Sequence, residues 1–302
     1  MNKKLFFSAS IYVFGISTLF AQTQGGPDLY GYIWKNSNDI SGNAPVYNWI
    51  DITTIGTEIT GLADDNVSAQ FPIGFVFKYY WTDVSNFCVG SNGYIVFESS
   101  VCPTISSVGL NFPPTPTADG KDNLIAPFMS DLRFDQNGGG APNPSKVYYY
   151  SNNTDILIVS FENVAWWTDD PPNNINGWQG TNTFQVILSA IDSSITFQYK
   201  KQQGSWDSAY DGVLYPVVTG IENISGQIGL MVSNIKPDTL LAIKYYYPQN
   251  STYTVEDVKP SWTNNPANAG FFEIVNRSVN ITTNVSNVGN VDINTSFNAF
   301  ID

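Results

Sequence analysis

Residues 86–97 read NFCVGSNGYIVF, in which two short β-forming runs flank the tripeptide Ser91-Asn92-Gly93. Asn-Gly supplies the positive φ angles that a tight hairpin turn requires, so this stretch predicts strand, turn and strand. A further apolar run, residues 123–132, follows a loop rich in proline. We expect these three runs to form the centre of a β-sheet.

The turn also predicts how the two strands of this hairpin pair. Cys88 should lie opposite Ile95 or Val96 across the turn. Successive side chains of a strand point to opposite faces, so one face of each strand can enter a core. The side chains that we expect in the core are Phe75, Phe87, Val89, Ile95 and Phe97.

Further short runs rich in aromatic and β-branched residues predict additional strands. They occupy residues 29–34, 46–52, 71–77, 146–150, 155–161, 183–188, 194–199, 213–218, 227–232 and 240–246. No stretch shows the 3.6-residue apolar period of a helix. Many short strands separated by turns predict an all-β fold, namely an antiparallel β-sandwich with long loops.

The composition restricts the classes of function. The chain has 302 residues, of which 15% are aromatic and 13% are charged, and its net charge is −13. Such a charge repels phosphate backbones and anionic lipids, so we expect no nucleic-acid partner. The chain contains no histidine, which removes the usual general base at neutral pH and the commonest transition-metal ligand.

The N-terminus has the pattern of a secretory signal peptide over residues 1–21. Lys3 and Lys4 precede an apolar run, and cleavage after Ala21 would leave a mature chain. No other run is long enough to cross a bilayer, so we expect a secreted or cell-surface protein without membrane insertion after signal removal. In that oxidising environment Cys88 and Cys102 either form a disulfide or stay as buried thiols, and the sequence leaves both open.

The composition changes near Pro248, which suggests two structural units. Residues 22–248 hold the predicted sandwich, and the segment after them is polar and punctuated by proline. Alternating runs at 279–285 and 291–297, with a turn between them, predict a late hairpin. Some 50 residues cannot complete an immunoglobulin-like sandwich of about 100, so we interpret residues 249–302 as a linker and the start of a truncated immunoglobulin-like domain.

A tryptophan-rich loop, residues 166–178 (WWTDDPPNNINGW), is the strongest ligand candidate. Aromatic faces can stack on the CH face of a sugar while carboxylate and amide groups hydrogen-bond to its hydroxyls. The candidate ligand-binding residues are Trp166, Trp167, Asp169, Asp170, Asn174 and Trp178. The alternative is that the tryptophans pack against the edge of the sandwich and anchor a long loop there.

Acidic loops offer oxygen ligands to a hard cation, so calcium is a candidate metal. The residues are Asp119, Asp122, Asp131 and Asp135, and the alternative is that they lie in solvated turns. No other cofactor is expected. Two triplets, at Ser208 and Thr239, resemble the acceptor pattern of bacterial O-glycosylation.

Catalysis would have to use carboxylates alone. Glu98 with Asp131, or Glu162 with Asp169, could form an acid–base pair of the glycosidase kind. No nucleophile motif such as Gly-x-Ser-x-Gly is present. We therefore expect a protein without catalytic activity.

Several motifs follow the order seen in nidogen-like extracellular domains, over roughly residues 71–199. They are FPIGF (71–75), VGSNGYIVF (89–97), LIAPFMSD (124–131), VYY (147–149), NV (163–164) and NTFQVIL (182–188). Met129 stands where those domains often carry tryptophan. The acidic chain and the late hairpin also resemble surface proteins exported by the type IX secretion system, in which CARDB-like immunoglobulin repeats commonly follow.

This resemblance implies a non-catalytic extracellular or cell-surface module for adhesion or for contact with a matrix or ligand. Its partner would be an extracellular glycan or a surface protein. The alternative is a carbohydrate-binding accessory domain of a secreted polysaccharide-degrading protein, which would use the tryptophan-rich loop.

Overall fold

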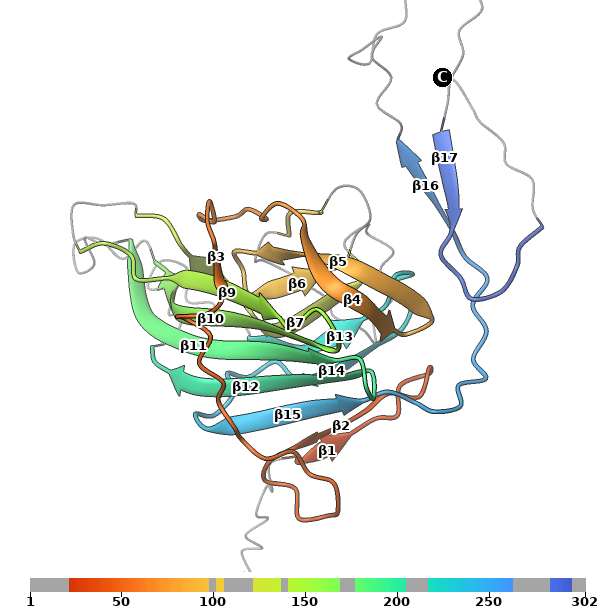
Figure 1. Cartoon of the computed structure of the whole chain (residues 1–302), viewed down its shortest axis with the longest axis horizontal. Coiled ribbons are helices and arrows are strands. Elements are labelled where there is room, and N and C mark those ends of the chain that lie inside the picture. The colour runs from red at the N-terminus through yellow and green to blue at the C-terminus, as the bar shows by residue number, and fades with distance from the viewer. Residues whose placement is uncertain are drawn as a thin grey trace, which may run out of the picture.

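The computed structural model describes residues 22–97, 102–105, 122–136, 141–168, 177–204, 217–262 and 283–294. These residues form antiparallel strands and loops with no helix among them, so the predicted all-β sandwich is confirmed (Figure 1). No helix that could span a membrane is therefore found in the described ranges. The predicted signal peptide, residues 1–21, lies outside them.

A nine-stranded sheet forms one layer of the sandwich. Its spatial order is β1 (Gln24–Gly25), β2 (Ile33–Asn36), β15 (Leu241–Tyr246), β12 (Ser194–Gln202), β11 (Trp178–Ser189), β10 (Ile156–Trp167), β9 (Lys146–Ser151) and β3 (Thr57–Ile59), with β8 (Leu132–Arg133) paired to β10. β2 begins later than the predicted strand 29–34. The reason is a turn in which Asp28 Oδ1 accepts hydrogen bonds from the backbone N–H groups of Gly31 and Tyr32.

A six-stranded sheet forms the second layer. Its spatial order is β14 (Gly229–Ser233), β13 (Val218–Glu222), β7 (Leu124–Met129), β6 (Tyr94–Val96), β5 (Thr82–Gly90) and β4 (Phe71–Tyr79). Apolar side chains of both sheets form one contiguous cluster, which we call the main core. The two sheets therefore pack face to face and share this core.

The central hairpin β5–β6 takes one of the two registers that the sequence left open. Cys88 pairs with Val96, and Val89 pairs with Ile95. The side chains that bury one face of this hairpin in the main core are Phe87, Val89, Ile95 and Phe97, as predicted. Phe75 packs against the same core while staying half-buried.

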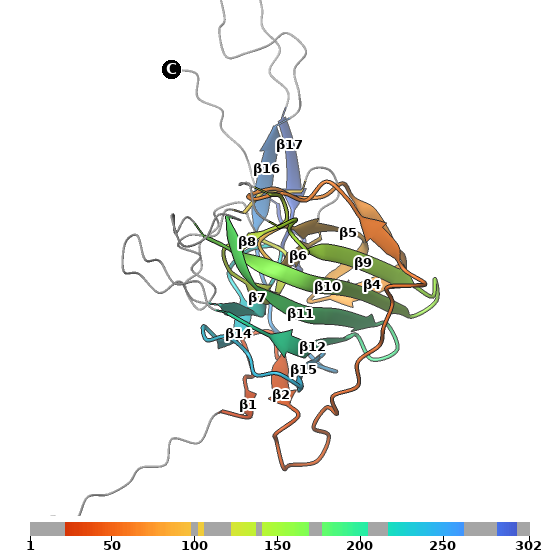
Figure 2. The same ribbon diagram turned by 90° about the vertical axis from the view of Figure 1, so that its left-hand side faces the viewer.

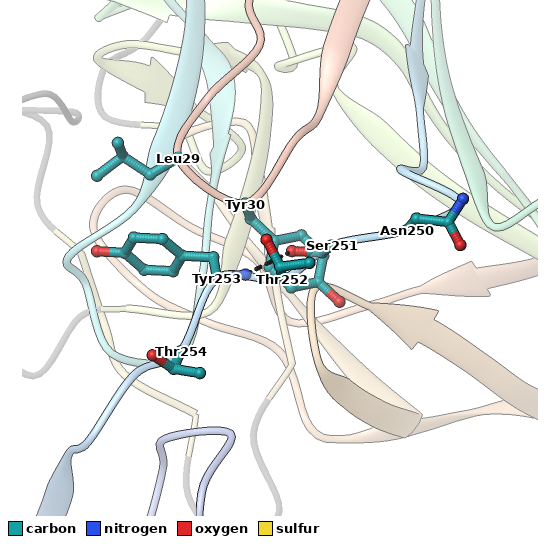
Figure 3. Close-up of a pocket in the computed structure, with 7 residues that line it drawn as sticks. All are labelled: Leu29, Tyr30, Asn250, Ser251, Thr252, Tyr253 and Thr254. Atoms are coloured by element: carbon teal, nitrogen blue, oxygen red, sulfur yellow. Dashed lines mark hydrogen bonds between the residues drawn. The ribbon is translucent and has the colours of Figure 1, made fainter.

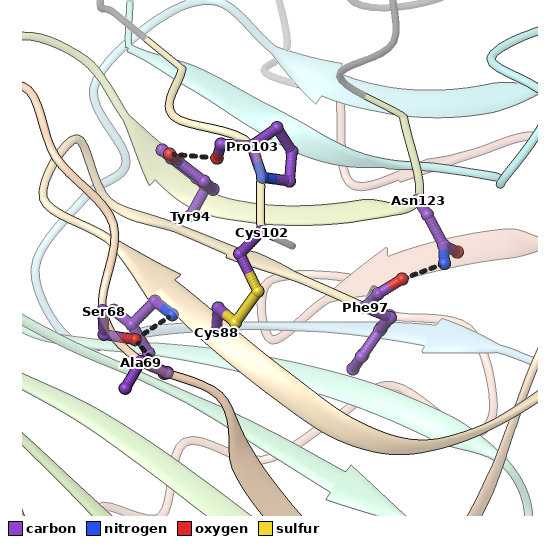
Figure 4. The surroundings of a disulfide bond; sticks show 9 residues. Ser68, Ala69, Cys88, Tyr94, Phe97, Cys102, Pro103 and Asn123 are labelled. Carbon is purple, nitrogen blue, oxygen red and sulfur yellow. Dashed lines mark hydrogen bonds between the residues drawn. A yellow bond between two sulfur atoms is a disulfide. The ribbon is translucent and has the colours of Figure 1, made fainter. Parts of the chain in front are cut away.

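The other face of the hairpin is buried as well. Its side chains belong to a second apolar group, which we call the outer cluster: Cys88, Tyr94, Val96, Ile105, Leu124, Ala126, Met129 and Val218. Residues 102–105 lie over this cluster. A disulfide between Cys88 and Cys102, with Cα atoms 6.3 Å apart, holds them there (Figure 4). Tyr94 Oη adds a bond to the Pro103 carbonyl and accepts one from Ile105 N–H at 2.9 Å.

The prediction of a strand at residues 46–52 is wrong. β2 and β3 lie near opposite edges of the nine-stranded sheet, so the chain between them has to cross that sheet. It crosses on the outer face as an extended segment, residues 46–52, which we call the strap (orange in Figures 1 and 2). A segment that crosses the strands has no neighbouring strand with which to form a ladder.

Two glutamine side chains take the place of that ladder. The Gln198 amide accepts a hydrogen bond from Asn48 N–H at 2.6 Å and donates to the Asn48 carbonyl at 2.7 Å. Gln185 makes the same pair of bonds to Ile50, at 3.2 and 3.0 Å. Gln185 and Gln198 are directly opposite each other on β11 and β12. The strap backbone is therefore hydrogen-bonded at Asn48 and Ile50 as if it were paired with a strand.

The C-terminal part forms a two-stranded sheet, β16 (Val258–Trp262) with β17 (Thr283–Asn287), which projects from the sandwich (Figure 1). The predicted pairing of 279–285 with 291–297 is wrong for the described residues, because β17 pairs with β16 and residues 291–294 form no strand. Val255 belongs to the main core, and Trp81 Nε1 donates to the Val288 carbonyl at 2.9 Å. The base of this extension is thus packed on the sandwich.

Gly93→Ala should be strongly destabilising. Gly93 has a φ of 77°, and a Cβ at this position would collide with the Phe128 carbonyl oxygen of β7. We expect the free energy of unfolding, measured with urea, to fall by at least about 3 kcal/mol. Gly61→Ala is the matched control, since its φ is 86° with nothing within 4 Å of the added Cβ. Equal losses in the two variants would contradict the proposed collision.

Gln198→Met should loosen the strap. The substitution keeps the length of the side chain but leaves Asn48 N–H and C=O without their partners. We expect a loss of about 1–3 kcal/mol in the free energy of unfolding and faster amide hydrogen exchange in the strap. Gln227→Met, at an exposed glutamine, serves as the control. Unchanged exchange in the strap would show that the amide does not hold it.

Reduction should destabilise the sandwich. The disulfide closes a loop with a sequence separation of 14 and fixes residues 102–105 over the outer cluster. We expect reduced protein, and the double variant Cys88→Ala, Cys102→Ala without reductant, to lose about 2–4 kcal/mol in chemical denaturation. Thiol titration of the unfolded parent should detect no free cysteine. Identical unfolding curves with and without reductant would contradict this assignment.

Candidate functional site

Two tryptophans of the predicted ligand loop face each other where β10 ends and β11 begins. Trp167 and Trp178 are direct cross-strand partners, and both are half-buried. Trp178 Nε1 donates a hydrogen bond to the Ala141 carbonyl at 3.3 Å, and Trp167 packs against the main core. We call these two residues the tryptophan pair. It is the part of the predicted ligand set that the structure brings together.

Trp166 points to the opposite side of β10. Its side chain is 1% exposed, its ring centroid lies 5.3 Å from that of Phe128, and its Nε1 donates to the Gln203 carbonyl at 3.0 Å. The ring has no free face on which a ligand could stack, so we assign Trp166 to the core. The predicted ligand residues Asp169, Asp170 and Asn174 lie outside the described residues.

Arg133 organises the surroundings of the tryptophan pair. Its side chain is buried, with Nε 2.7 Å from Asp135 Oδ1, and its guanidinium also donates to the Gly177 carbonyl at 3.4 Å. Gly177 directly precedes Trp178, so this bond holds the start of β11 near β8. Burial raises the pKa of the nearby Asp64 carboxyl group, and the positive charge of Arg133 opposes that shift. This end of the sandwich is therefore charged as well as aromatic.

The candidate calcium ligands are spread over the fold. Asp122 precedes β7 and Asp131 follows it, so a six-residue strand, about 20 Å long, separates them. Asp135 is engaged by Arg133. In the described ranges no group of three or more His, Cys, Asp or Glu side chains could hold a metal ion. Asp119 lies outside those ranges, and calcium binding stays a prediction.

The other candidate residues are only partly described. Thr239 is exposed in the turn before β15, whereas Ser208 lies outside the described residues, so O-glycosylation stays a prediction. Glu162 accepts a hydrogen bond from Ser160 Oγ at 2.8 Å, and burial raises its pKa. Glu98 and Asp169, the partners needed for the two carboxylate pairs, are outside the described ranges.

A surface cavity of about 340 Å³ lies where the segment after β15 crosses the N-terminal turn (Figure 3). Its lining residues are Leu29, Tyr30, Asn250, Ser251, Thr252, Tyr253 and Thr254. The Tyr30 hydroxyl is already bonded to the Tyr80 carbonyl at 3.0 Å and to the Tyr247 hydroxyl at 2.9 Å. These two hydrogen bonds tie the end of the sandwich to the segment that leads to β16. The Tyr30 hydroxyl is therefore already hydrogen-bonded within the protein.

Sequence reasoning missed the neighbours of the tryptophan pair. Arg133 and Ala141 come from segments far from residues 166–178, and no motif links them to the loop. Pairing of β8 with β10 brings Arg133 there, and β8 has two residues, too few for a recognisable strand pattern.

Comparison with protein families gives one match. A family model described as NIDO related matches residues 41–269, which is more than half of the chain. The match includes the strap and both sheets except β1 and β2, and it continues past the predicted boundary at residue 248 into β16. Neither the search of curated proteins nor the search of solved structures found a significant match.

Proposed function

Because this chain belongs to the NIDO-related family, we propose that it is a non-catalytic extracellular module that contacts a surface protein or a glycan. The observation that carries the proposal is the family match across the sandwich, which fits the extracellular role expected of nidogen-like domains. A secreted or cell-surface location agrees with the signal-like N-terminus and the disulfide. Export by the type IX system and a CARDB-like unit in residues 249–302 belong to the same proposal.

We place the contact surface at the tryptophan pair. Amphipathic tryptophan rings that are half-buried supply rigid contact area at low cost in conformational entropy, which suits recognition of another molecule. The Asp135 carboxylate, whose side chain is 42% exposed, and the loop carbonyls next to the pair supply hydrogen-bond acceptors. The tryptophan pair is carried by the ends of β10 and β11, which the nine-stranded sheet holds in place.

The second candidate function is a carbohydrate-binding accessory domain of a secreted polysaccharide-degrading protein. It is favoured by the same tryptophan pair, since an aromatic ring beside hydrogen-bonding groups suits a sugar. Under this alternative the ligand is a polysaccharide, and the domain serves an enzyme carried elsewhere.

Trp178→Ala should remove binding at this surface. We expect purified residues 22–302 to bind at least one member of an array of glycans and matrix proteins, and Trp178→Ala to weaken that binding about tenfold or more. Tyr148→Ala, at a half-buried aromatic residue of β9, should leave binding unchanged. Selective binding of polysaccharides would favour the accessory domain, and selective binding of proteins would favour the adhesion module.

Two results would overturn the proposal. Binding that survives Trp178→Ala would remove the tryptophan pair from the contact surface. Turnover of a glycan by the parent protein, lost in Glu162→Gln, would show that the module is catalytic.

A further inference from the structure

The surface cavity of about 340 Å³ lies between two parts of the chain that are far apart in the sequence, and we call it the junction cavity. One wall is the N-terminal turn with Leu29 and Tyr30, and the other is residues 250–254, which we call the connector because they lead from β15 towards β16 (Figure 3). Pockets for small molecules often form where two parts of a protein meet, and their volumes run from roughly 300 to 1,000 Å³. The junction cavity falls at the lower end of that range, so it suits a small ligand.

Both walls are held in place by hydrogen bonds outside the cavity. The Tyr30 hydroxyl donates to the Tyr80 carbonyl at 3.0 Å, which fixes the N-terminal wall. The Asn290 side chain fixes the connector, because its Nδ2 donates to the Tyr253 carbonyl at 2.5 Å and its Oδ1 accepts from Val255 N–H at 2.6 Å. Walls that are already ordered lower the entropic cost of binding a ligand.

The polar side chains of the connector are open to a ligand. Asn250, Thr252 and Thr254 line the cavity and are exposed, and within the described part of the chain their side chains make no hydrogen bond. Ser251 Oγ accepts from Tyr253 N–H at 3.4 Å and keeps its own proton to donate. Amide and hydroxyl groups both donate and accept, so the connector offers both kinds of bond at once.

The remaining features of the lining select against a charged ligand. Among the described residues that line the junction cavity, none carries a charge, so an ion bound there would lack a counter-charge. Leu29, which is 65% exposed, and the half-buried Tyr253 add apolar surface beside the polar groups. An uncharged ring with hydroxyl groups on its edge and CH groups on its face matches this combination.

We propose that the junction cavity binds one ring of a neutral sugar. Its hydroxyl groups bond to Asn250, Thr252 and Thr254, and its CH groups lie against Leu29 and Tyr253. A ring in this position contacts both walls and therefore ties the connector to the N-terminal turn.

The junction cavity and the tryptophan pair lie at opposite ends of β5. Tyr80, which binds Tyr30, precedes that strand, whereas Asn92, which binds Leu132 N–H, follows it. Leu132 is the cross-strand partner of Trp166, beside the tryptophan pair. A strand of nine residues is about 30 Å long, so the two places are separate, and the proposal does not depend on binding at the tryptophan pair.

The test uses saturation-transfer NMR and titration calorimetry of residues 22–302 with glucose, galactose and mannose. N-acetylglycinamide, a neutral amide that also donates and accepts, represents the competing class of peptide ligands. Thr252→Val removes one hydroxyl group at nearly constant shape, and Thr252→Trp fills the cavity. Thr57→Val and Thr57→Trp are the matched controls, since Thr57 is an exposed threonine of β3.

We expect at least one of these sugars to bind, with its affinity reduced about fivefold in Thr252→Val, the loss of one hydrogen bond, and tenfold or more in Thr252→Trp. Both Thr57 variants and Trp178→Ala should bind it as the parent does. Circular dichroism checks that each variant is folded, and Thr252 is exposed, so neither change empties the core. Absence of sugar binding, binding of N-acetylglycinamide alone, or sugar binding that survives Thr252→Trp would overturn the proposal.

Discussion

The hydrogen bonds of the buried Asn92 side chain are the interactions on which much of the sandwich depends. Its Nδ2 donates to Asp65 Oδ1 at 2.7 Å and to the Ile105 carbonyl at 3.2 Å, and its Oδ1 accepts from Leu132 N–H at 3.0 Å. One fully buried amide thus joins the turn of the central hairpin to three segments distant in the sequence. Because buried polar groups must be satisfied together, these segments are expected to become ordered together.

The same requirement explains how the outer faces of the two sheets are covered. The six-stranded sheet buries its outer cluster beneath residues 102–105, which the disulfide retains. The nine-stranded sheet carries the strap, whose backbone is satisfied by Gln185 and Gln198. Segments of the chain itself thus lie on the outer faces of both sheets.

The fold alone does not fix a function, since β-sandwiches serve many unrelated ones. The proposed function therefore depends on a local feature, the end of the sandwich that holds the tryptophan pair. This end is aromatic and charged, with tryptophan rings beside a buried arginine.

The sequence by itself determined the all-β class, the position of the β5–β6 hairpin and the core face of that hairpin, because alternation and the Asn-Gly turn are local signals. Tertiary structure decided the rest. Residues 46–52 have the composition of a strand but cross the sheet, since β2 and β3 lie near opposite edges. Trp166 and Trp167 are adjacent in sequence, yet opposite faces of β10 bury one and leave the other half-exposed. Asn123 and Asn223 become neighbours only when β7 pairs with β13, and no local pattern encodes a contact between residues 100 positions apart.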